Sequence, residues 1–164
     1  MKHFIHNSIY LLLLTLIIFT GCKKNPSSVF NPIIERYVNI WNTGNFNGIN
    51  EILDREFELK MAPTFKPEKG IELFKVQIQQ TRTAYPDFNI VLNEIVYDKD
   101  KIAALWTIKA TNTGMGGNPP TGKKVNIQGI SIIHFKNGKI LDEWIAYDTG
   151  YWLKQLGSQM APSL

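Results

Sequence analysis

The chain has 164 residues, which is enough for one domain with a tail but not for two large domains. Hydrophobic residues make up 44% of it and charged residues 20%, so most of the chain is expected to fold. The net charge of +4 is small and scattered, which argues against nucleic-acid binding, and the single cysteine, Cys22, excludes an internal disulfide and any cysteine-based zinc site.

The first 21 residues have the pattern of a signal peptide. Lys2 provides a positive charge, and residues 9–19 are almost wholly apolar. These eleven residues, as a helix, span about 16 Å, well short of the roughly 30 Å hydrocarbon core of a bilayer. We therefore interpret residues 1–21 as a secretory signal rather than as a membrane-spanning helix.

The sequence Phe19-Thr20-Gly21-Cys22 resembles the cleavage box of bacterial lipoproteins, with Phe19 where leucine is usual. The resemblance implies cleavage before Cys22, a diacylglycerol on its sulfur and an acylated amine, which together anchor the protein to a lipid bilayer. The alternative is an ordinary secretory signal followed by an unrelated cysteine. Lys23 and Lys24 follow without an acidic residue, so we expect a lipid-anchored protein of the bacterial cell envelope, in the outer membrane and facing the periplasm or the exterior.

The segment after the signal predicts a tether and then a helix. We expect residues 22–30 to form the lipid anchor and a polar, flexible linker. Asn31 is a plausible N-cap and Pro32 suits the first helical position. Apolar residues then recur at helical spacing until Thr43-Gly44 ends the helix: Ile34, Tyr37, Val38 and Trp41.

Shorter elements follow in the first half of the chain. Residues 46–53 predict a short helix and residues 57–61 a short strand. Lys66-Pro67-Glu68 leads into a third helix, which must stop near Tyr85 because Pro86 disfavours a helical residue before it.

From Asp87 onward the hydrophobic pattern alternates, which is typical of strands. Asn137-Gly138 is a strong signal for a two-residue hairpin turn. The predicted strands are residues 88–97, 102–111, 124–135 and 140–147, with a final short helix at 151–156. Helices followed by an antiparallel meander make an α+β fold, in which the helices cover one face of the sheet and a pocket can remain between them.

Several short motifs follow one another in the second half of the chain: Tyr85-Pro86-Asp87-Phe88, Trp106-Thr107, Asn118-Pro119-Pro120-Thr121-Gly122-Lys123, Gly138-Lys139-Ile140, Glu143-Trp144 and Gln155-Leu156-Gly157. Their order and spacing resemble those of the SnoaL-like polyketide cyclase family. The resemblance implies that residues 31–158 form a nuclear transport factor 2-like cone, a curved sheet wrapped around helices with a deep pocket.

The family resemblance also implies a chemistry, which this chain matches only in part. Family cyclases close a ring by aldol condensation without metal or cofactor, using a pocket aspartate as general acid/base and helper histidines. Ile145 stands where that aspartate is expected, and Ser131, Glu143 and Lys60 stand where the histidines are expected. Isoleucine cannot exchange a proton, so the aldol mechanism does not carry over.

Glu143 is the candidate catalytic residue. Strand alternation places Glu143, Ile145 and Tyr147 on one face, which the family register turns toward the pocket. A carboxyl among Ile145, Trp106 and Tyr147 is poorly solvated, and desolvation raises its pKa toward the range useful for proton transfer. The alternative is that Glu143 forms an ion pair at the pocket rim, with Lys60, and has no chemical role.

The remaining site residues are candidates for substrate binding. Ser131 can orient a ligand carbonyl, or be an ordinary strand serine. The aromatic residues can form a pocket wall, or be plain core. The full substrate-binding set is Tyr37, Trp41, Trp106, Ser131, Ile145 and Tyr147.

The histidines carry little chemistry. His3 and His6 lie in the segment expected to be removed, which leaves His134 and excludes multi-histidine metal sites. By parity, His134 lies on the face opposite Ser131, as a surface or interface residue.

Three functions remain open. The first is a membrane-anchored lipoprotein whose pocket binds a small hydrophobic or carbonyl-containing ligand, with binding or a diverged activity favoured by Ile145. The second is a cyclase- or isomerase-like enzyme in which Glu143 transfers protons. The third is a structural protein with a filled cone. Analogy also suggests a homodimer through the outer sheet face, where Trp144 is available. The discriminating observation is whether Glu143 points into a closed cavity or into water.

Overall fold

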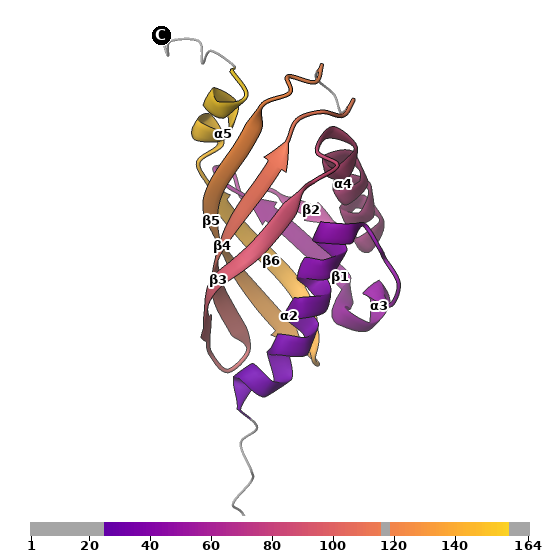
Figure 1. Cartoon of the computed structure of the whole chain (residues 1–164). Helices are drawn as coiled ribbons and strands as arrows, with labels where there is room; N and C mark the ends of the chain where they lie inside the picture. The colour runs from indigo at the N-terminus through magenta and orange to yellow at the C-terminus, as the bar shows by residue number, and fades with distance from the viewer. Residues whose placement is uncertain (1–24, 116–118, 158–164) are drawn as a thin grey trace, which may run out of the picture.

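A curved sheet of six strands, in the order β2-β1-β6-β5-β4-β3, carries the helices on its concave side (Figure 1). The computed structural model describes residues 25–115 and 119–157. The expected signal peptide and Cys22 lie outside the described residues. The elements in chain order are α2 (Pro26–Thr43), α3 (Ile49–Ile52), β1 (Leu53–Met61), β2 (Pro67–Lys69), α4 (Ile71–Ala84), β3 (Asn89–Tyr97), β4 (Lys101–Thr111), β5 (Lys124–Lys136), β6 (Lys139–Tyr147) and α5 (Thr149–Gln155).

The four long strands predicted from alternation are confirmed. β4 and β5 alternate buried and exposed residues along most of their length, which is the expected pattern when one face of a strand packs on the core. The β5–β6 hairpin turns at Asn137 and Gly138, whose φ angles of 52° and 75° are the positive values that such a turn requires. The α+β class and the cone are confirmed as well.

The antiparallel meander predicted for β3 to β6 is confirmed, but the sheet as a whole is mixed rather than antiparallel throughout. β1 pairs in parallel with β6, so that Leu59 lies opposite Glu143 and Met61 opposite Ile145. The residues 67–69, expected to lead into a helix, instead form β2, which pairs antiparallel with β1. The local pattern identifies a strand but not the direction of its partner, because β1 and β6 lie far apart in the chain.

The first helix begins earlier than predicted, so the start at Asn31 is wrong. Asn25 is the N-cap, its side chain accepting a hydrogen bond from the Ser27 amide at 3.2 Å, and Pro26 follows at the first helical position. Residues 26–30 of the expected tether are therefore helical. The added turn buries Phe30, which stacks on Phe135 with ring centroids 4.0 Å apart.

The other helices differ only at their ends. α3 is shorter than predicted because Leu53 already begins β1, and α4 ends at Ala84 just before Tyr85-Pro86, as predicted. Within the two described ranges, no helix combines the length and apolar character needed to cross a membrane.

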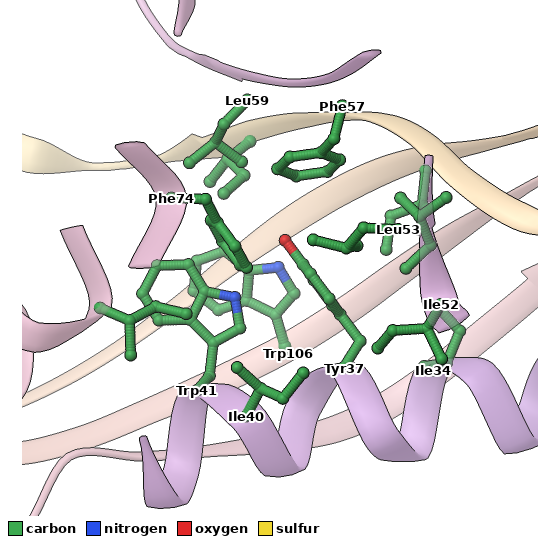
Figure 2. Close-up of a cluster of buried hydrophobic side chains, with 14 of the residues drawn as sticks. Ile34, Tyr37, Ile40, Trp41, Ile52, Leu53, Phe57, Leu59, Phe74 and Trp106 are labelled. Carbon is green, nitrogen blue, oxygen red and sulfur yellow. The ribbon is translucent and has the colours of Figure 1, made fainter. Parts of the chain in front are cut away.

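An aromatic cluster fixes α2 and α4 against the sheet (Figure 2). The ring of Tyr37 stacks on Phe74 of α4 at 5.5 Å, and Phe74 meets Phe57 of β1 edge-on at 5.0 Å. Figure 2 shows Tyr37 and Trp41 rising from the same side of α2, with the Tyr37 hydroxyl pointing into the interior. This packing positions the side chains that line the cavity.

Candidate functional site

A cavity of about 230 Å³ lies between the helices and the concave face of the sheet. This cavity excludes the filled cone that a purely structural role requires. Its lining is mostly apolar and contains every predicted site residue of the domain. The lining residues are Ile34, Tyr37, Val38, Trp41, Met61, Gln77, Thr81, Tyr85, Phe88, Ile90, Leu92, Ala104, Trp106, Ile108, Ser131, Ile133, Glu143, Ile145, Tyr147 and Trp152.

Glu143 is the acidic residue of this lining, and it is buried, with 5% of its surface exposed. β6 places it between Leu59 of β1 and Ile133 of β5, both buried. The Tyr37 hydroxyl donates a hydrogen bond to Glu143 Oε2 at 2.5 Å. Because a buried carboxyl needs hydrogen-bond partners, this contact ties α2 to β6 at the centre of the site.

Ser131 and Trp106 form the second polar contact of the site. The Trp106 indole N–H donates to Ser131 Oγ at 2.9 Å. A hydroxyl that accepts this bond keeps its own hydrogen for another acceptor, and the influence of Ser131 lowers the pKa of the Glu143 carboxyl. Tyr37 donates a hydrogen bond to that carboxyl, and Ser131 lines the same cavity.

A glycine makes room for the indole. Gly129 lies directly opposite Trp106 across β4 and β5. A Cβ atom on Gly129 would stand 2.2 Å from Cη2 of Trp106, closer than any side chain allows. Glycine at this position thus lets the Trp106 ring lie close over β5, in reach of Ser131.

The electrostatics follow from burial. Desolvation raises the pKa of Glu143 above its ordinary value, and the hydrogen bonds from Ser131 and Tyr37 partly oppose this by favouring the carboxylate. Burial and the neighbouring Glu143 raise the pKa of Tyr37 well above its ordinary value, so the phenol keeps its proton and acts as a donor. Glu143 therefore stays protonated to a higher pH than a carboxyl exposed to water.

The alternative of an ion pair between Glu143 and Lys60 is wrong. In the parallel pairing of β1 and β6, Lys60 lies opposite Trp144, and its side chain is on the outer face. Its ammonium group binds Asp142 at 2.9 Å and Glu58 at 3.1 Å. Trp144, which lies opposite Lys60, is the neighbour of Glu143 on β6. Because neighbouring strand residues point to opposite faces, Lys60 and Glu143 lie on opposite faces of the sheet.

His134 lies on the outer face, as predicted, with Nδ1 2.6 Å from Asp142 Oδ1. It is not among the residues that line the cavity. Among residues 25–115 and 119–157, no group of three or more histidine, cysteine, aspartate or glutamate side chains is placed to hold a metal ion.

Sequence reasoning missed two parts of the lining. At one end, Trp152 of α5 donates to the Tyr85 hydroxyl at 3.3 Å and packs near Tyr147, at 6.0 Å between ring centroids. On α4, Gln77 and Thr81 face the cavity, and their spacing of four residues is the signal that could have revealed a shared helical face.

A sequence profile of one known family, the SnoaL-like polyketide cyclases, matches residues 31–156. No curated protein sequence matches the chain.

Solved structures match the fold. A candidate polyketide cyclase from Bacillus cereus is 25% identical, with a TM-score of 0.64, over 76% of this chain and 78% of that chain. TsrD from Streptomyces laurentii is 22% identical, with a TM-score of 0.70, over 80% and 97% of the two chains. A candidate SnoaL-like polyketide cyclase from a Jannaschia species reaches a TM-score of 0.72 at 13% identity, over 81% and 94%.

Proposed function

The chain belongs to the SnoaL-like polyketide cyclase family, and from that premise we propose that its cavity binds a small, largely apolar carbonyl compound on which Glu143 acts as general acid/base. The observation that carries this proposal is the enclosed carboxyl: Glu143 lies in an apolar cavity, not in water or at a rim. Its raised pKa brings the carboxylic acid and carboxylate forms closer in population near neutral pH, which a proton-transfer group needs.

The chemistry is proton transfer next to a carbonyl. The Glu143 carboxylate removes a proton from the carbon adjacent to the carbonyl, which leaves an enolate and a protonated Glu143. The enolate then recovers that proton at another atom, which isomerises the compound. Tyr37, hydrogen-bonded to Glu143, holds the carboxyl in place during this exchange, and Ser131 lines the same cavity.

A second function, ligand binding without chemistry, is favoured by Ile145. This residue lies on the same face of β6 as Glu143 and lines the cavity, at the position where the family resemblance expects the acid/base aspartate. A cavity that keeps its shape but loses that aspartate is suited to hold a ligand unchanged.

Native mass spectrometry of the whole protein, purified from its own host, separates the two functions. The comparison is with Glu143→Gln, which keeps the shape of the side chain but removes its charge. If wild type arrives empty while the variant retains a compound that added wild type converts, Glu143 is catalytic. If both retain the same unchanged molecule, binding is the function. Glu94→Gln, on the exposed part of β3, is the matched control.

We also propose that an acylated Cys22 anchors the protein to a membrane, because residues 19–22 resemble a lipoprotein cleavage box. We further propose that it forms a homodimer through the outer sheet face. Support comes from apolar side chains exposed on neighbouring strands of that face: Val96, Leu105, Ile130, Ile132 and Trp144.

A further inference from the structure

Gln77 of α4 has a buried amide oxygen without a hydrogen-bond donor. Among the described residues, nothing donates to its Oε1. The Nε2 atom of the same amide donates a hydrogen bond to the Met61 sulfur at 3.5 Å, and a thioether is a weak acceptor. Native proteins rarely leave a buried polar atom in this state, because the lost hydration is not replaced.

The position of this amide points to the missing partner. Gln77 lines the cavity, so the space that can supply a donor is the ligand site. The terminal torsion of a glutamine is broad, so its oxygen can turn toward a donor in the cavity without a change of rotamer elsewhere.

The register of the sheet relates Gln77 to Glu143. Gln77 contacts Met61, which lies opposite Ile145, two residues beyond Glu143 on β6. Two strand residues correspond to about 7 Å. Both side chains line the same cavity, so one bound molecule can reach both of them.

The size and charge of the cavity restrict the chemical class of the ligand further. Its volume of about 230 Å³ is below the roughly 300–1,000 Å³ of pockets for drug-sized ligands, which favours a compound of one or two rings. The described residues that line it include no lysine, arginine or histidine, and the ionisable acid Glu143 disfavours an anionic ligand.

We propose that Gln77 is a specificity residue, whose amide oxygen accepts a hydrogen bond from a hydroxyl or N–H group of the ligand. Building on the proposed function, the ligand class is a neutral hydroxy- or amino-carbonyl compound of one or two rings. Its carbonyl lies at Glu143 and its donor at Gln77.

Three matched probes test the assignment: para-hydroxyacetophenone, para-methoxyacetophenone and acetophenone. All have the same ring and carbonyl, and only the first has a donor across the ring. Binding to the full chain is measured by titration calorimetry, with wild type compared with Gln77→Leu and with Gln80→Leu, which makes the same change on the exposed side of α4.

The expected result is that wild type binds the hydroxy probe about tenfold more tightly than the methoxy probe, and that Gln77→Leu removes this preference. Gln77→Leu should also keep its affinity for acetophenone and raise the melting temperature, because it replaces an unpartnered amide with an apolar group. The rise in melting temperature shows that loss of preference is not loss of fold.

Equal binding of the hydroxy and methoxy probes to wild type would overturn the role of Gln77 and leave the proposed function standing. If Gln77→Leu still binds the hydroxy probe more tightly than the methoxy probe, the role of Gln77 is likewise overturned and the proposed function stands. That result would indicate that water, not the ligand, donates to the Gln77 amide. Failure of all three probes to bind any variant would overturn the proposed function, and this inference with it.

Discussion

Tyr37 and Glu143 are 106 positions apart in the chain, yet the Tyr37 hydroxyl lies 2.5 Å from Glu143 Oε2 in the buried interior. The contact joins α2 to β6. It also lowers the pKa of Glu143, because a hydrogen bond from the phenol favours the charged form of the carboxyl.

Tyr37→Phe removes this donor and leaves the ring in place. We expect the pKa of Glu143 to rise further, because the hydrogen bond that opposes desolvation is lost. Stability should fall by about 1–3 kcal/mol at neutral pH, the usual cost of an unsatisfied buried group. Carboxyl carbon chemical shifts followed against pH, together with urea unfolding, check both effects. An unchanged titration of Glu143 would show that Tyr37 is not coupled to it.

The stability of the protein should depend on pH through Glu143. Its pKa is higher in the folded state than in the unfolded chain, so its stabilising contribution is complete below the unfolded value, about 4.3, and is lost as pH rises through the folded value. Glu143→Gln cannot ionise and should not show this loss. The difference in unfolding free energy between variant and wild type, measured by urea titration, should therefore grow in favour of the variant with rising pH. A difference that stays flat would contradict the raised pKa.

Asp142 and Glu58 make the wild-type curve alone insufficient for this test. The pKa of Glu58 is lowered by Lys69 and Lys60, and that of Asp142, against the opposing effect of burial, is lowered by Lys60 and His134, so both carboxyls add stability that is lost at acid pH. Comparison with Glu143→Gln cancels their contribution, since both proteins retain them.

Gly129→Ala should disturb the site without touching a polar group. The new Cβ would stand 2.2 Å from the Trp106 ring, so the indole must shift away from Ser131. We expect a loss of about 1–3 kcal/mol in stability, as for other overpacked cores, and a change in tryptophan fluorescence. Retention of the wild-type melting temperature and emission would show that the ring has room to move.

The proposed dimer can be tested on the outer face. Ile132 is 44% exposed on β5, and Ile132→Lys places a charge among the apolar side chains around Trp144. Light scattering should then report a monomer where wild type is a dimer. Leu153→Lys on α5, at 42% exposure, is the control and should stay dimeric. If wild type is itself a monomer, the proposed homodimer is wrong.

The lipid anchor rests on Cys22. Cells grown with a labelled fatty acid should incorporate the label into wild type and not into Cys22→Ala, and the variant should leave the membrane fraction. Cys22→Ala that still sediments with membranes would mean that another segment holds the protein there.

Local signals identified most of the secondary structure. Asn137-Gly138, the alternation of β4 to β6 and the stop before Tyr85-Pro86 are all readable from the sequence, because turn geometry, pleat and proline sterics act within a few residues. Parity along β6 also placed Glu143, Ile145 and Tyr147 on one face, and all three line the cavity.

Only the tertiary structure decided what those residues meet. Strand parity put Glu143 on the same face as Ile145 and Tyr147, but the tertiary structure decided that this face is buried, that Leu59 lies opposite Glu143 and that Lys60 is on the outer face. Likewise, the packing of α4 brought Gln77 to the cavity and the packing of α2 brought Tyr37 to the carboxyl. Hydrogen bonds and burial between distant segments depend on how whole elements pack, and no pattern within a few residues carries that information.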